Sequence, residues 1–163
     1  RFMVKSNTQY PSADQELELL SRGAAGFDSR YLERMGLTTV ASSDEIAAAR
    51  RDVRGVHVSP ALRQYVYDIV SRTRSAGELS LGASPRAGLH LVVAAQASAS
   101  IDGRDFATPD DVKSAAPLVL AHRLIVRAEA EVEGVTSDTV LRRILESVTV
   151  PKDAEQAPAT DAV

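Results

Sequence analysis

The chain has 163 residues and a mass of 17.4 kDa, and its hydrophobic content of 44% and charged content of 25% are typical of a soluble globular protein. No apolar run approaches the roughly 20 residues that a membrane-spanning helix needs. The absence of cysteine excludes disulfides and thiolate metal sites and favours a reducing compartment. The net charge of −3 and the scattered basic residues disfavour nucleic-acid binding through a basic surface.

The first residues predict a short strand followed by a helix. The chain begins at Arg1 and enters a strand-like stretch at residues 2–7, whose backbone groups need neighbours that this sequence does not supply. We therefore expect residues 1–10 to be a terminal strand and a connection from a larger protein. Ser12 and Gln15 have the spacing of a capping box, which predicts a helix that ends near Gly23.

A long connection precedes the second predicted helix. Residues 22–41 contain three glycines and no sustained hydrophobic period, so we expect an irregular loop with a helical turn at Ser29 to Met35. A loop of this length inside a domain is uncommon. Ser42 and Glu45 then form a second capping box, which predicts a helix that ends at Gly55.

Four further helix starts follow. A capping side chain precedes a proline in the first helical position at Ser59-Pro60, Ser84-Pro85 and Thr108-Pro109, and the last helix begins near Ser137-Asp138. We expect Pro117 to enter or kink a separate helical stretch.

These elements together predict a mainly α fold. Residues 11–150 are expected to form a bundle of five or six helices, to which the terminal strand and one minor β pairing are added. The alternating residues 123–127 are expected to pair with "VHV" at 56–58. Residues 151–163 are rich in Ala, Pro and acids, which predicts a disordered tail.

The stretch "LGASPRAGL" at residues 81–89 breaks a local rule. Ser84 is a good N-cap and Pro85 a good first helical residue, so Arg86 lies in the first turn, where the helix dipole favours carboxylates over cations. The mismatch is worth only about 0.3–1 kcal/mol, so a surface arginine could tolerate it. An arginine that binds a phosphate would exploit it, because the helix N-terminus attracts the same anion.

Several kinds of chemistry are absent from the sequence. No G-x-x-x-x-G-K-[ST] loop occurs, because none of the lysines at positions 5, 113 and 152 follows a glycine. The three histidines lack metal-ligand spacing, and no G-x-S-x-G elbow occurs. We interpret His122 as a helix cap and His90 as a packing residue, and Gly88 predicts close helix packing. Because the phosphate-binding loop is absent, we expect that the chain alone does not hydrolyse a nucleoside triphosphate.

Four stretches carry a resemblance to a known family: "YPSADQELELL", "VSPALRQYVYDIVSRTR", "LGASPRAGLHLVVAAQASASIDGRDFATPDDVKSAAPLVLAHRL" and the downstream "VP". Together, over most of residues 1–151, they resemble the C-terminal helical lid region of MoxR-family AAA+ ATPases. Within them, "GASPRA" is similar to the sensor 2 motif. The resemblance implies that Ser84, Pro85 and Arg86 bind nucleotide and that Arg86 reaches the β/γ-phosphates of ATP.

The resemblance also implies properties of a full-length protein. It implies an ATPase whose P-loop core and Mg²⁺ site precede Arg1, so that ATP and Mg²⁺ are cofactors of the whole protein. Arg1-Phe2 resembles the end of an "L-D-R-F" segment, which implies that Arg1 is an arginine finger offered to a neighbouring subunit. Similar proteins are cytoplasmic ring hexamers that remodel or mature other proteins, often with a von Willebrand A domain partner.

A second class of function stays open at this stage, namely a non-enzymatic helical module for protein interaction or a nucleic-acid adaptor. An adaptor would present basic, base-reading side chains on one exposed helix face. The predicted helix from Ser59 carries Arg63, Arg72 and Arg74 beside Asp68, which is thin support for that class.

Overall fold

The computed structural model describes residues 2–31 and 36–151. The chain divides into two units: the first contains residues 2–5 and the chain from Ala48 onward, and the second contains Ser6–Ala47. Residues 152–163 of the predicted tail lie outside the described residues, as does Arg1. The disorder of the tail therefore stays a prediction.

The second unit contains helix α1 (Ala13–Ala24), which begins as its capping box predicts. The side-chain oxygen of Gln15 accepts from the Ser12 N–H at 2.9 Å, and the Ser12 hydroxyl accepts from the Gln15 N–H at 3.4 Å. The described residues of the connection after α1 form turns and irregular backbone, as expected. Residues 32–35 of the predicted helical turn lie outside the described residues.

Helix α2 (Ser43–Gly55) follows the second predicted capping box. The Glu45 carboxylate accepts from the backbone N–H and the hydroxyl of Ser42 at 2.7 and 2.8 Å, and the Ser42 hydroxyl accepts from the Glu45 N–H at 3.2 Å. Neither α1 nor α2 buries any residue. Capping and helix propensity are the local interactions that favour these two helices.

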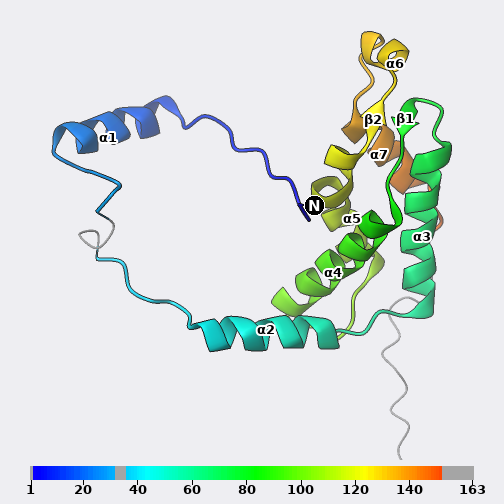
Figure 1. Ribbon diagram of the computed structural model, residues 1–163, viewed down its shortest axis with the longest axis horizontal. Coiled ribbons are helices and arrows are strands. Elements are labelled where there is room, and N and C mark those ends of the chain that lie inside the picture. Colours follow the sequence, from blue (N-terminus) through cyan, green and yellow to red (C-terminus); the bar gives the residue numbers. More distant parts are fainter. Residues whose placement is uncertain (1, 32–35, 152–163) are drawn as a thin grey trace, which may run out of the picture. The chain divides into compact units, whose positions relative to one another are not determined.

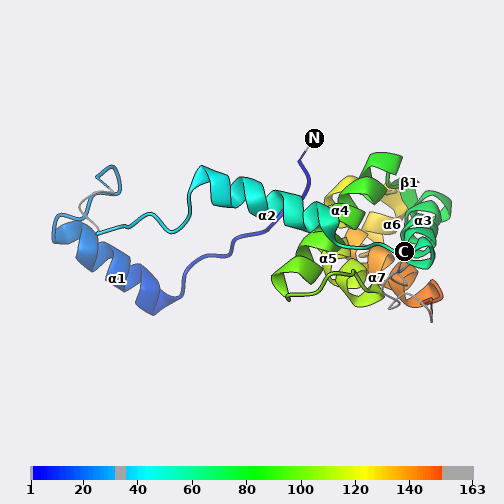
Figure 2. The same ribbon diagram turned by 90° about the horizontal axis from the view of Figure 1, so that it is seen from below.

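The first unit is a helical bundle. Figures 1 and 2 show α3 (Pro60–Ser75), α4 (Pro85–Ile101), α5 (Pro109–Leu120) and α7 (Ser137–Ser147) gathered together. Helix α4 packs along α5 and α3, and its buried residues recur every fourth position, which is one helix face. The apolar core is formed by these residues, among others: Leu62, Val66 and Ile69 of α3, Leu91 and Ala95 of α4, Val112 and Val119 of α5, Leu141 and Ile144 of α7.

The turn between α4 and α5 is held by an ion pair. The Arg104 guanidinium contacts both carboxylate oxygens of Asp111, at 2.7 and 2.8 Å, and Asp111 is only 5% exposed. Burial alone would raise the pKa of Asp111, but the hydrogen bonds from Arg104 and Thr108 outweigh it and lower this pKa to about 2. The same carboxylate completes the predicted capping box with Thr108.

The predicted minor β pairing exists, but with a different partner. Strand β2 (Ile125–Val126) pairs antiparallel with β1 (Leu79–Leu81), and not with residues 56–58. His57 instead forms an isolated parallel bridge with Phe106, in which the Ala107 N–H donates to the His57 carbonyl at 2.9 Å. The prediction failed because β1 is only three residues long, too short for its alternation to be recognised.

Two other local predictions need correction. Residues 2–7 contain no strand, and the Lys5 N–H forms one backbone hydrogen bond, to Leu118 of α5 at 2.9 Å. Pro117 lies inside α5 and does not begin a separate helix. The structure also contains two short elements that were not predicted, the 3-10 turn η2 (Ala121–Arg123) and helix α6 (Ala128–Val132).

Candidate functional site

The site begins with the N-terminus of α4, where Arg86 lies as predicted. Ser84 has the extended backbone of an N-cap (φ −78°, ψ 163°), but its side chain forms no capping hydrogen bond, whereas Pro85 occupies the first turn. The first turn contains no acidic residue. The positive end of the α4 dipole is therefore not compensated by a side chain of its own helix.

Arg86 itself is exposed. Among the described residues, its guanidinium forms no hydrogen bond or ion pair with a protein group. This differs from Arg104, whose charge is neutralised by Asp111 and Asp102. A guanidinium that keeps its donors available at an uncompensated helix N-terminus suits an anion with several oxygens, because both features attract negative charge.

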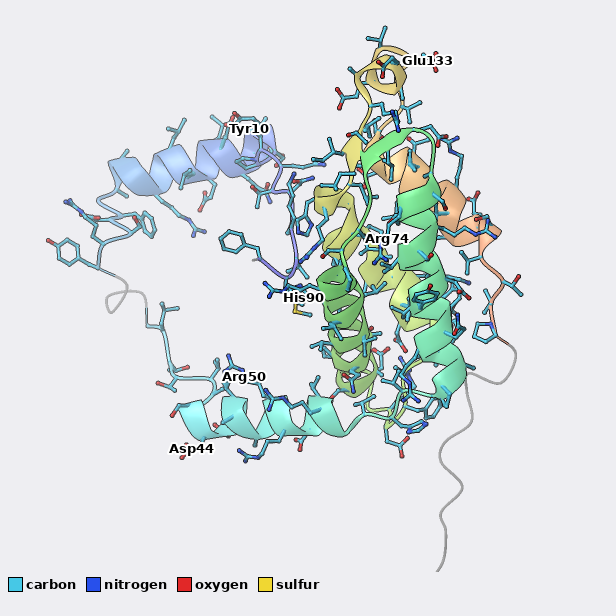
Figure 3. All side chains as sticks on the ribbon, turned by 45° about the vertical axis from the view of Figure 1, so that its right-hand side comes forward. Tyr10, Asp44, Arg50, Arg74, His90 and Glu133 are labelled. Atoms are coloured by element: carbon cyan, nitrogen blue, oxygen red, sulfur yellow. The ribbon has the colours of Figure 1, made fainter. Side chains whose placement is uncertain are left out.

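The loop before Arg86 is fixed to the end of α3. The Ala83 N–H donates to the Thr73 hydroxyl at 2.8 Å, and that hydroxyl donates to the Val70 carbonyl at 2.6 Å. The Arg74 side chain donates to the Ala83 carbonyl at 2.8 Å, and Figure 3 shows it on α3 beside this loop. Both backbone groups of Ala83 are therefore held by α3, and this sets where α4 begins.

Gly82 is required by the same close approach. A Cβ atom at this position would lie 2.6 Å from the Thr73 carbonyl oxygen and 2.7 Å from the Arg74 Cα. Both are backbone atoms, which cannot move aside as a flexible side chain would. Gly88 has a milder role, because a Cβ there would lie 3.6 Å from Val70, in ordinary van der Waals contact. Its predicted close packing is confirmed as a contact with α3.

His90 and Arg123 lie on the same side of α4 as Arg86. His90 follows Arg86 by four residues, which places the two on one helix face. The Arg123 guanidinium lies 2.8 Å from the His90 Nδ1, and Figure 3 shows His90 on the side of α4 that carries residues 2–5. Burial, and then the positive charges of Arg123 and Arg86, lower the pKa of His90. The neutral imidazole is therefore the form that this cluster favours.

The structure thus brings together part of the predicted site. Ser84, Pro85 and Arg86 occupy one turn, while Arg1 lies outside the described residues and its role as an arginine finger stays a prediction. Sequence reasoning missed Thr73 and Arg123, which act through contacts with residues 10 and 121 positions away. The only sequence signal for Arg123 was its place beside His122 at a helix end.

Two other features are absent from the described part of the chain. In the described ranges 2–31 and 36–151, no group of three or more histidine, aspartate or glutamate side chains could hold a metal ion. Within those ranges, no helix has both the length and the apolar character that a membrane crossing requires.

The chain matches one protein family and is similar to several known proteins. Residues 71–144 match the family described as "AAA lid domain". The chain is 34% identical to "Uncharacterized protein YeaC" of Bacillus subtilis (strain 168) over 151 residues, which cover 93% of this chain and 46% of that protein. It is 31% identical to "Chaperone MoxR1" of Mycobacterium tuberculosis over 166 residues, which cover 93% of this chain and 41% of that protein.

A solved structure agrees with these relatives. The crystal structure of a "putative ATPase" from Cytophaga hutchinsonii superposes with a TM-score of 0.80 and 30% identity, over 93% of this chain and 47% of that one. The chain therefore spans about half the length of the relatives that it matches.

Proposed function

This chain is the lid region of a MoxR-family AAA+ ATPase, and we propose that it senses bound ATP through Arg86. The observation that carries the proposal is the exposed guanidinium of Arg86 at a helix N-terminus that has no acidic residue in its first turn. In the proposed full-length protein, Arg86 donates hydrogen bonds to the β/γ-phosphate oxygens of ATP held by the ATPase core. Ser84 and Pro85 shape the same turn.

The residues of this chain fit a triphosphate better than a metal ion. ATP supplies a chain of phosphate oxygens, and Arg86 supplies donors that no described protein group occupies. Mg²⁺ needs carboxylate or other oxygen ligands, and the described residues contain no acidic cluster that could hold it. We therefore assign Mg²⁺ to the core and the phosphate contact to the lid.

The lid has two consequences for the reaction in this proposal. First, a guanidinium close to the γ-phosphate stabilises the charge that develops during phosphoryl transfer. Second, the hydrogen bonds from Arg74 to the Ala83 carbonyl and from the Ala83 N–H to Thr73 attach the loop before Arg86 to α3. The position of Arg86 therefore depends on the helical bundle. Binding or loss of the γ-phosphate would then change the angle of the lid against the core, which is how hydrolysis would drive remodelling of other proteins.

The larger assembly also belongs to this proposal. The core that precedes this lid, the neighbouring subunits of a hexameric ring and a von Willebrand A domain protein are the partners that we propose, with the cytoplasm as their location. The relative "Chaperone MoxR1" supports a chaperone-like activity by its name alone. By itself, this chain is proposed to be inactive, because it contains no phosphate-binding loop of the G-x-x-x-x-G-K-[ST] type.

Steady-state ATP turnover of the full-length protein tests the proposal. We expect Arg86→Ala to lower kcat by about tenfold or more, which corresponds to about 1.4 kcal/mol of transition-state stabilisation. Arg142→Ala is a matched control, because Arg142 is an exposed arginine on α7. Equal kcat values for Arg86→Ala, Arg142→Ala and wild type would refute the sensor role and make Arg86 a surface or structural residue of the lid. Circular dichroism confirms that each variant is folded.

A further inference from the structure

Arg123 joins three separate segments of the first unit. Its Nε donates to the Val119 carbonyl of α5 at 2.7 Å. Its Nη2 lies 2.5 Å from the Phe2 carbonyl oxygen, 3.2 Å from the Met3 carbonyl oxygen and 2.8 Å from the His90 Nδ1 on α4, so its two hydrogens are shared among three acceptors. One half-buried side chain thus connects α4, α5 and the segment that contains residues 2 and 3.

The direction of the contact between Arg123 and His90 follows from chemistry. A guanidinium can only donate hydrogen bonds, so the His90 Nδ1 must accept. An imidazole that accepts at Nδ1 is neutral and carries its proton on Nε2. His90 therefore presents a defined tautomer on the α4 face that it shares with Arg86, one helical turn away.

Residues 2–5 have few other attachments to the bundle. Phe2 is 84% exposed and Val4 is 49% exposed, so apolar burial contributes little to holding them. The backbone hydrogen bonds of the segment are those from Arg123 to Phe2 and Met3, and that from the Lys5 N–H to Leu118, within the described residues. Arg123 consequently provides most of the polar attachment of this segment.

We propose that Arg123 and His90 are positioning residues, which clamp residues 2 and 3 to α4 and thereby hold Arg86 in place relative to the incoming chain. The inference rests on the proposed function of Arg86. In the full-length protein, residues 2–5 connect the lid to the preceding core, so a shift of that chain reaches α4 through Arg123 and His90. Neither residue touches ATP in this proposal.

Kinetics of the full-length protein test the positioning role. We expect Arg123→Ala and His90→Ala each to lower kcat by about fivefold while the KM for ATP changes less than about twofold. His90→Asn should retain at least about half of the wild-type kcat, because its amide oxygen can replace Nδ1 as the acceptor. Arg123→Lys should not rescue, because one ammonium cannot reproduce the planar set of donors.

A double-mutant comparison separates positioning from an independent effect. If Arg123 acts through Arg86, Arg86→Ala with Arg123→Ala should have the kcat of Arg86→Ala alone. Multiplied losses would overturn the positioning role. If Arg86→Ala lowers kcat and the Arg123 and His90 variants do not, the clamp is refuted and the sensor stands. If Arg86→Ala leaves kcat unchanged, the proposed function fails and the positioning role fails with it.

Amide hydrogen exchange provides a readout without turnover. The Lys5 N–H, which donates to Leu118 at 2.9 Å, reports whether residues 2–5 stay attached. We expect Arg123→Ala to accelerate exchange at Lys5 by about tenfold, whereas Arg142→Ala leaves it unchanged. Unchanged exchange at Lys5 in a folded Arg123→Ala variant would overturn the clamp, whatever the kinetics show.

Discussion

Replacing Thr73 by valine tests the attachment that sets the start of α4. Thr73 is fully buried on α3, and its hydroxyl both accepts from the Ala83 N–H at 2.8 Å and donates to the Val70 carbonyl at 2.6 Å. Valine has nearly the same shape, so the substitution removes the hydroxyl without creating a cavity. Ala83 is only 2% exposed, so its N–H has no access to water once the hydroxyl is gone.

The magnitude follows from that orphaned donor. A buried N–H without an acceptor costs about 1–3 kcal/mol. The Val70 carbonyl stays satisfied, because it lies four residues before Arg74 within α3 and accepts the helical hydrogen bond from that residue. We therefore expect Thr73→Val to lower the free energy of unfolding by about 1–3 kcal/mol, out of the roughly 5–15 kcal/mol that a natural domain has.

Urea unfolding followed by circular dichroism measures this loss. Thr139→Val on α7 is the matched control, because Thr139 is exposed and the same substitution there should stay within about 0.5 kcal/mol of wild type. Amide exchange at Ala83 should also accelerate in Thr73→Val. A free energy of unfolding indistinguishable between the two valine variants would refute the argument that the Thr73 hydroxyl holds the loop.

Two other predictions concern the same bundle. Gly82→Ala places a Cβ 2.6 Å from the Thr73 carbonyl oxygen, so it should lower the free energy of unfolding by about 1–3 kcal/mol, whereas Gly77→Ala, with no atom within 4 Å, should be nearly neutral in the same urea titration. The pKa of Asp111 is lowered to about 2 in the folded state, so its stabilisation is complete above about pH 4 and is lost as the pH falls toward 2. Unfolding titrations between pH 5 and about pH 2 should lose about 2 kcal/mol from this group. Asp111→Asn should lack that part of the pH dependence, the exposed control Asp110→Asn should keep it, and parallel pH curves for Asp111→Asn and wild type would contradict the assignment.

The helix starts were predictable because capping acts over three residues. Ser12, Ser42, Ser59 and Thr108 each accept from the backbone N–H three positions later, and the sequence pattern contains both partners. Ser84 shows the limit of this reasoning. Its backbone has the conformation of an N-cap, but its side chain does not form the capping bond.

Elements that depend on distant partners were not predictable in the same way. The strand-like residues 2–7 remain irregular because a strand exists only with a neighbour to pair with, and β2 pairs with Leu79–Leu81, which lie more than 40 positions earlier. Pro117 stays within α5 although it lacks an N–H for the helical ladder. Its neighbours Ala116 and Val119 are buried in the core, and this packing outweighs the lost hydrogen bond.

The candidate site also has a part that was predictable from local sequence and a part that depends on distant contacts. The place of Arg86 in the first turn of α4 was predictable, because Ser84 and Pro85 signal the helix start, and a cation there conflicts with the helix dipole. Thr73 and Arg123 were not, since their roles exist only after α3, α4, α5 and residues 2–3 come together. The ligand role of Arg86 stays a prediction, whereas the contacts of Thr73 and Arg123 are visible only in the structure.

Helix α4 buries a face that is rich in alanine. Ala87, Ala95 and Ala99 are at most 1% exposed on the face that α4 buries in the bundle, and burying alanine costs no side-chain rotamer entropy. A 17-residue helix is about 25 Å long. A rotation of α4 about its Arg86 end would therefore displace its far end, near Asp102, by a distance that this length sets.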